Sequence, residues 1–126
     1  MKIRTTYLDH VVLTVSDVDA SARWWSELTG SRTTHDYEGE VSLLVGGQAI
    51  RLRQGTPAPT GSVSICLIAD ASIHELYDRA DELHAVHGSV HPRTAATAPA
   101  QAITLVDPDG YHVELATYTP EGVPIP

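Results

Sequence analysis

Two residues with chemically active side chains lie in stretches of the sequence that are otherwise apolar. His10 begins the run HVVLTV, and Glu114 lies between Val113 and Leu115. A carboxylate in such a strand needs a cation or a hydrogen-bond donor, because an unpaired buried charge is costly. A histidine there can act as a metal ligand, as a general base or as a hydrogen-bonded core residue. These two positions are the first candidates for a catalytic site.

Strand alternation adds further candidates beside them. His112 lies two residues before Glu114 and shares its face of the strand. It is either a second imidazole for the site or a polar residue at the entrance of the strand. Arg51 and Arg53 share a face in the same way, and two arginines in one pocket favour an anionic or carboxylate-bearing ligand. The alternative is that Arg51 and Glu114 both face water.

The sequence contains an internal repeat that relates these positions. The segment HVVLTVSDVDASARWWSEL, which starts at His10, aligns with SICLIADASIHELYDRADEL, which starts at Ser64. In the same way GGQAIRLR aligns with DGYHVELA, so that Arg51 is equivalent to Glu114. Two fused copies predict a pseudo-twofold axis at which equivalent residues converge. We expect His10, Arg51, Ser64 and Glu114 to line one cavity, with Arg51 paired to Glu114.

Each copy has the pattern of one strand, one helix and three further strands. The first helix is predicted from about residue 18, with Asp17 or Asp19 as its cap, and it stops at Gly30. The linker GTPAPTG separates the copies. Strands are predicted over residues 7–15, 32–37, 40–45, 48–54, 63–69, 90–94, 101–106 and 111–117, and the second helix over residues 73–84.

Composition limits the class of protein and the kind of partner. The 126 residues suit one domain, and a net charge of -8 with a single lysine leaves no basic patch for nucleic acid or anionic membrane. A small-molecule ligand is the expected partner. The single cysteine, Cys66, suits a reducing compartment, and no leader or long apolar run is present. We therefore expect a cytoplasmic protein.

Together, the repeat and the segments LDHVVLTVSDVDASARWWSELTG and DPDGYHVELATY resemble the vicinal oxygen chelate superfamily. That superfamily groups glyoxalase I, extradiol dioxygenases, fosfomycin-resistance enzymes and bleomycin-binding proteins. The resemblance covers about residues 7–118. It implies an α+β fold in which two βαβββ modules, at about residues 7–55 and 62–118 of a single domain over residues 1–126, form a curved eight-stranded sheet around one cavity. Half-closed sheets of this kind leave open edges, and a homodimer is expected to cover them.

The resemblance also assigns metal positions. They fall on His10, Arg51, Ser64 and Glu114, where members of the superfamily hold a divalent cation with three or four His, Glu or Gln side chains. Only His10 and Glu114 are ligand types here, and an arginine stays protonated and cannot coordinate a metal. His112 could partly restore the ligand count. We expect an incomplete site without a tightly bound divalent ion.

Two functions follow from these expectations. The first is a glyoxalase- or dioxygenase-like enzyme, of lyase, isomerase or dioxygenase type, that acts on a small oxygenated metabolite. His10 and Glu114 would be its residual metal ligands or its general base and acid, and Arg51 would polarise a substrate oxygen. Arg53, Ser64 and His112 would also bind the ligand. The second, the alternative, is a non-catalytic protein that sequesters a small molecule or antibiotic, as bleomycin-resistance proteins do. The low ligand count favours this protein or a metal-free enzyme over a glyoxalase, whereas the retained His10 and Glu114 favour the enzyme, which we expect.

Overall fold

The computed structural model describes residues 2–36, 38–83 and 85–118. The chain divides into two compact units, Met1–Pro57 and Ala58–Pro126. The boundary falls inside the GTPAPTG linker, whose prolines and glycines disfavour regular structure. Each unit is a module with its own hydrogen-bonded sheet.

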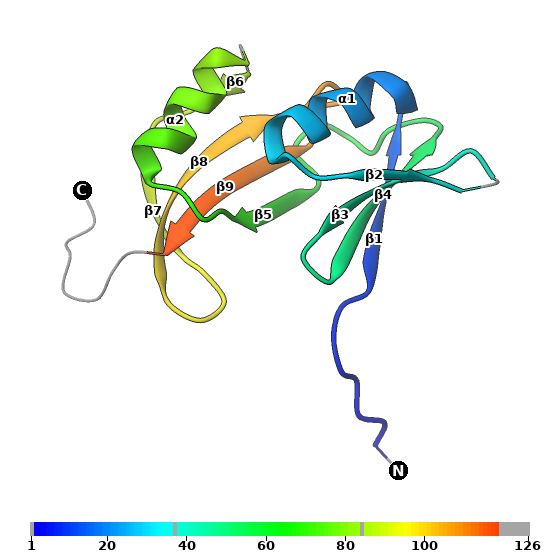
Figure 1. The fold of residues 1–126 in the computed structure, drawn as a ribbon, viewed down its shortest axis with the longest axis horizontal. Helices are drawn as coiled ribbons and strands as arrows, with labels where there is room; N and C mark the ends of the chain where they lie inside the picture. Colours follow the sequence, from blue (N-terminus) through cyan, green and yellow to red (C-terminus); the bar gives the residue numbers. More distant parts are fainter. Residues whose placement is uncertain (1, 37, 84, 119–126) are drawn as a thin grey trace. The chain divides into compact units, whose positions relative to one another are not determined.

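The first module runs from strand to helix to three strands (Figure 1). Its sheet has the order β1-β4-β3-β2, in which β1 is parallel to β4 and the other pairs are antiparallel. A parallel pair needs a long connection, and α1, β2 and β3 supply it. The elements are β1 (His10–Val15), α1 (Val18–Thr29), β2 (Thr33–His35), β3 (Val41–Val45) and β4 (Gln48–Gln54).

Local signals fix both ends of α1. Oδ1 of Asp17 accepts a hydrogen bond from the backbone N–H of Ala20 at 3.0 Å, as expected of an N-cap. Gly30 ends the helix in the left-handed conformation, with φ 69°. Trp25 is fully buried, and α1 packs against β3 and β4. The predicted cap and stop of this helix are confirmed.

The second module repeats this plan with one addition. Its five-stranded sheet has the order β5-β9-β8-β6, and β7 also pairs with β8. β5 is parallel to β9, and α2 packs against β8 and β9. The elements are β5 (Ser64–Ile68), α2 (Ile73–Glu82), β6 (Val86–His87), β7 (His91–Thr94), β8 (Pro99–Val106) and β9 (His112–Tyr118).

Neither helix of the described ranges is long and apolar enough to cross a membrane.

The strand register agrees with the sequence repeat. In the parallel pair of the first module Val12 lies beside Arg51, and in that of the second module Cys66 lies beside Glu114. Val12 and Cys66 each lie two residues after the start of the aligned segments. Arg51 and Glu114 therefore occupy equivalent places in their sheets, and the predicted α+β fold of two βαβββ modules is confirmed.

The structure differs from the sequence predictions at several element ends and by one added strand. β1 begins at His10 rather than at residue 7, because its neighbour β4 starts at Gln48 and offers no partner to residues 7 and 8. β6 is an extra strand of two residues, so the second sheet has five strands where four were expected. The predicted strand 32–37 is shorter, and Tyr37 and His84, at the ends of two predicted elements, lie outside the described residues.

A tight turn before β9 positions the strand that carries Glu114. Oδ1 of Asp107 accepts hydrogen bonds from the backbone N–H groups of Asp109 at 2.9 Å and Tyr111 at 2.8 Å. Gly110 has φ 89°, and a Cβ there would lie 2.5 Å from Oγ1 of Thr60. Only glycine fits this position without strain.

Replacing Gly110 by alanine should therefore destabilise the protein. The left-handed backbone alone costs an L-residue about 1–2 kcal/mol, and the overlap with Thr60 adds to this. Gly47→Ala is the matched control, because no atom lies within 4 Å of its Cβ position and its φ lies outside the left-handed region. Urea unfolding should show a large loss only for Gly110→Ala, and equal losses in both variants would contradict this account.

Candidate functional site

The first module places His10 and Arg51 side by side. Nη1 of Arg51 is 3.4 Å from Nε2 of His10, and Nδ1 of His10 is 2.7 Å from Oδ2 of Asp9. A guanidinium can only donate, so Nε2 accepts and Nδ1 carries the ring proton. The lone pair of His10 that a metal would use therefore faces a cation.

A buried glutamate contacts both arginines of β4, Arg51 and Arg53. Glu40 is 8% exposed, and its Oε1 lies 2.6 Å from Nε of Arg53. Its Oε2 lies 3.7 Å from Nε of Arg51, which also donates to the hydroxyl of Ser42 at 3.2 Å. One carboxylate facing two guanidinium groups leaves a net positive charge here. The two arginines share a face, as alternation predicts, and Glu40 anchors both.

In the second module a buried carboxylate has an arginine of its own. Glu114 is 8% exposed, and its Oε2 lies 3.1 Å from Nε of Arg93 in β7. Oε2 accepts no well-formed hydrogen bond from the described residues, so the attraction is mainly electrostatic. Sequence reasoning assigned Arg51 to Glu114; in the structure Arg93 contacts this carboxylate, whereas Arg51 contacts Glu40 and His10.

Cys66 places a thiol beside the same carboxylate. The residue as a whole is exposed, yet burial of the thiol is the largest cause that raises its pKa above the ordinary value. The negative charge of Glu114 and a hydrogen bond to it also raise the pKa, whereas Arg93 lowers it. The thiol is therefore protonated at neutral pH, which makes it a hydrogen-bond donor rather than a nucleophile.

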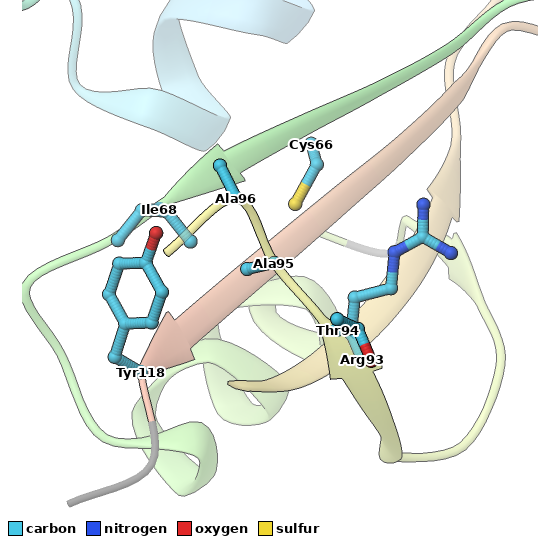
Figure 2. A pocket seen from close by; sticks show the side chains of 7 residues that line it. All are labelled: Cys66, Ile68, Arg93, Thr94, Ala95, Ala96 and Tyr118. Carbon is cyan, nitrogen blue, oxygen red and sulfur yellow. The ribbon is translucent and has the colours of Figure 1, made fainter. Parts of the chain in front are cut away.

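A pocket opens on this side of the second sheet. Its volume is about 210 Å³. Figure 2 shows Arg93 on one side of the pocket and Tyr118 and Ile68 on the other, with Cys66 and Ala95 between them. The lining residues are Cys66, Ile68, Arg93, Thr94, Ala95, Ala96 and Tyr118.

A cluster of small side chains lies against two residues that line this pocket. Ala100, Ala102 and Ala116 are fully buried and form one cluster, against which Ala95 and Tyr118 pack. In the sequence repeat Ala116 takes the place of Arg53. The second sheet therefore has a methyl group where the first has a long side chain that is tied to Glu40.

The other predicted residues of the second module lie at the opposite end of the strand pair. Ser64 lies beside His112 in the β5–β9 register and is exposed. The ring of His112 covers Gly61, since a Cβ at Gly61 would lie 3.5 Å from its Cε1 and Nε2 atoms. The expectation that residues of both modules line one cavity stays a prediction.

Sequence reasoning missed Arg93 and Glu40. Arg93 lies in a short predicted strand without clear apolar alternation. In the sheet it lies beside Ala100 of β8, whereas Glu114 lies beside Thr104, so only the long arginine side chain reaches the carboxylate. One signal was available. From residue 58 onward the only basic side chains besides histidine are Arg79 and Arg93, and Arg79 falls in a predicted helix. Charge balance therefore leaves Arg93 as the strand-borne partner of Glu114.

The donors present do not suit the divalent metal that the superfamily resemblance implies. Neither module gathers three His, Cys, Asp or Glu side chains in a metal-binding arrangement within the described ranges. Nε2 of His10 faces Arg51, and Oε2 of Glu114 faces Arg93. An ion at either position would have to displace a guanidinium, so no chemical step is assigned to a metal here.

Comparison with known proteins identifies the family. Residues 7–115 match the Glyoxalase/Bleomycin resistance protein/Dioxygenase superfamily, and the chain belongs to it. The predicted resemblance to this superfamily is confirmed.

Among its relatives is virulence protein STM3117 of Salmonella typhimurium, which is 31% identical over 122 residues, covering 88% of this chain and 83% of that protein. The crystal structure of that protein matches this chain with a TM-score of 0.84 and 28% sequence identity. The match covers 93% of this chain and 100% of that one. An integron cassette protein of Vibrio cholerae also has a TM-score of 0.84, at 24% identity over 94% of this chain and 100% of its own. At that identity the second likeness shows the fold alone.

The environment of Cys66 predicts an unusual alkylation profile. Its reaction with iodoacetamide should have a pH midpoint above that of a free thiol, about 8.5. Glu114→Gln should lower the midpoint, because the thiolate would no longer form beside a negative charge. Arg93→Ala should raise it, because a stabilising cation is lost. Mass spectrometry reads the rate directly on the single cysteine, and shifts of the opposite sign would contradict the geometry.

Proposed function

We propose that the protein is a small-molecule-binding member of the superfamily that works without a resident divalent metal ion. Its ligand is a small oxygenated organic molecule. One observation carries the proposal: each of the two retained metal-ligand residues faces an arginine, His10 at 3.4 Å from Arg51 and Glu114 at 3.1 Å from Arg93.

Electrostatics supports a metal-free site. Two like unit charges about 4 Å apart repel by about 4 kcal/mol at an effective dielectric constant near 20, and a divalent ion doubles this. A single protein ligand in each module would have to offset that repulsion. Arg93 already neutralises the carboxylate of Glu114, and this pairing does not require the removal of water from a metal ion.

Calorimetric titration of chelator-treated protein with Zn²⁺, Ni²⁺ and Fe²⁺ tests this proposal. We expect no stoichiometric binding in the sub-micromolar range. Arg93→Gln serves as the comparison, because it leaves Glu114 without its cation and should strengthen any residual metal binding. Sub-micromolar binding of one ion per chain that disappears in Glu114→Ala would contradict the proposal.

A second candidate function rests on the contact between Asp9 and His10. A carboxylate 2.7 Å from Nδ1 orients an imidazole and leaves Nε2 as a base, the arrangement of general acid–base catalysis. Arg51, beside Nε2, would polarise the oxygen of a carbonyl substrate. The protein would then be an enzyme that removes a proton next to a carbonyl group, with no metal in the step.

Proton exchange tests this candidate without a known substrate. Small carbonyl compounds with an acidic C–H bond, such as dihydroxyacetone and methylglyoxal, are incubated with the protein in D₂O and followed by NMR. An enzyme should speed deuterium uptake, and His10→Gln should lose about 10²-fold or more of that effect. Uptake that does not depend on His10 would leave the binding protein as the proposed function.

A further inference from the structure

The pocket of the second module combines an apolar interior with a single cation. Ile68, Ala95 and the ring of Tyr118 supply apolar surface, and the buried alanines lie behind Ala95 and Tyr118. Arg93 is the only charged residue that lines it within the part of the chain that the structure describes. Such a pocket suits a ligand with an apolar body and one negatively charged group.

Arg93 has N–H donors available for binding an anion. Its Nε lies 3.1 Å from Glu114, which is buried, whereas the Arg93 side chain is 50% exposed. Neither of its Nη groups forms a hydrogen bond with the other described residues. A guanidinium whose Nε side faces a carboxylate still has N–H donors on both Nη atoms, and these match the two oxygens of a second carboxylate.

We infer that this pocket binds the carboxylate group of a small organic acid, with Arg93 as the anion-binding residue and Tyr118 and Ile68 against its apolar part. The inference rests on the proposed function, since it names the ligand class of a metal-free protein.

Charge and size narrow the ligand further. The carboxylate of Glu114 lies directly behind Arg93, so a dianion such as a phosphate group would meet more repulsion than a monoanion. The thiol of Cys66 adds no charge, because burial and Glu114 raise its pKa. The pocket volume of about 210 Å³ is smaller than that of pockets for drug-sized ligands, which is about 300–1,000 Å³. A monocarboxylate with one ring or a short chain fits these limits.

Benzoate and benzamide form a matched pair of probes, because they have the same shape and differ in charge. Titrated into the full chain and followed by NMR in buffer with chelator, benzoate should bind at one site, about tenfold or more tighter than benzamide. Arg93→Ala should reduce benzoate to the affinity of benzamide. Arg93→Lys keeps the positive charge but lacks the parallel N–H donors of a guanidinium. This variant should fold and should lose most of the preference for benzoate over benzamide.

Arg79→Ala is the control for loss of a positive charge. Arg79 is also half-exposed and pairs with a glutamate at 3.1 Å, but it lies on α2 and outside the pocket. Its removal should leave the benzoate preference unchanged. The inference is overturned if benzoate binds no tighter than benzamide, if Arg93→Ala keeps the preference, or if Arg79→Ala loses it equally.

Two further titrations test the class of anion and the need for a metal ion. Phenylphosphonate that binds more tightly than benzoate would overturn the assignment of a monocarboxylate. Benzoate binding that appears only after addition of Zn²⁺ would contradict the metal-free function. Weak benzoate binding in chelator together with no metal binding would leave that function intact and overturn the carboxylate site alone.

Discussion

A buried carboxylate needs a cation, and in this protein arginine supplies it in both modules. Glu40 and Glu114 are each 8% exposed, and each lies within ion-pair distance of the Nε atom of an arginine, Arg53 and Arg93. Leaving either buried carboxylate without a partner would cost several kcal/mol. The need of these carboxylates for a cation therefore limits which other groups the same sheet faces can bind. An arginine that neutralises a carboxylate also brings N–H donors that can bind a further group.

The fold provides the positions for these pairs by register rather than by sequence proximity. β9 places Glu114 beside Cys66 of β5, and Arg93 of β7, which lies beside Ala100 of β8, reaches the same carboxylate with its long side chain. The alanines of β8 and β9 form a buried cluster against which Ala95 and Tyr118, two residues that line the pocket, pack. In the first module the same face holds Arg53 and Glu40 instead. The two copies thus keep one backbone plan and differ in the chemistry of their sheets.

Much of this architecture could be predicted from the sequence, because the repeat fixes the order of strands and the equivalence of Arg51 with Glu114. The helix cap at Asp17 and the helix stop at Gly30 also follow from local patterns. The partner of Glu114 could not be obtained in this way. It depends on how β7 pairs with β8, and a four-residue strand with little apolar alternation does not encode its own register. The sequence predicted that a cation was needed, and the structure shows which arginine provides it.

The central claim is that Arg93, rather than a metal ion, neutralises Glu114. A double-mutant cycle on these residues tests it most directly, with urea unfolding of the parent, Arg93→Ala, Glu114→Gln and the double variant in buffer with chelator. The account predicts a coupling of about 1 kcal/mol, which is limited by the exposure of Arg93 to water. It also predicts the same coupling when chelator is replaced by Zn²⁺. Losses that add within about 0.3 kcal/mol, or a coupling that depends on the metal, would contradict it.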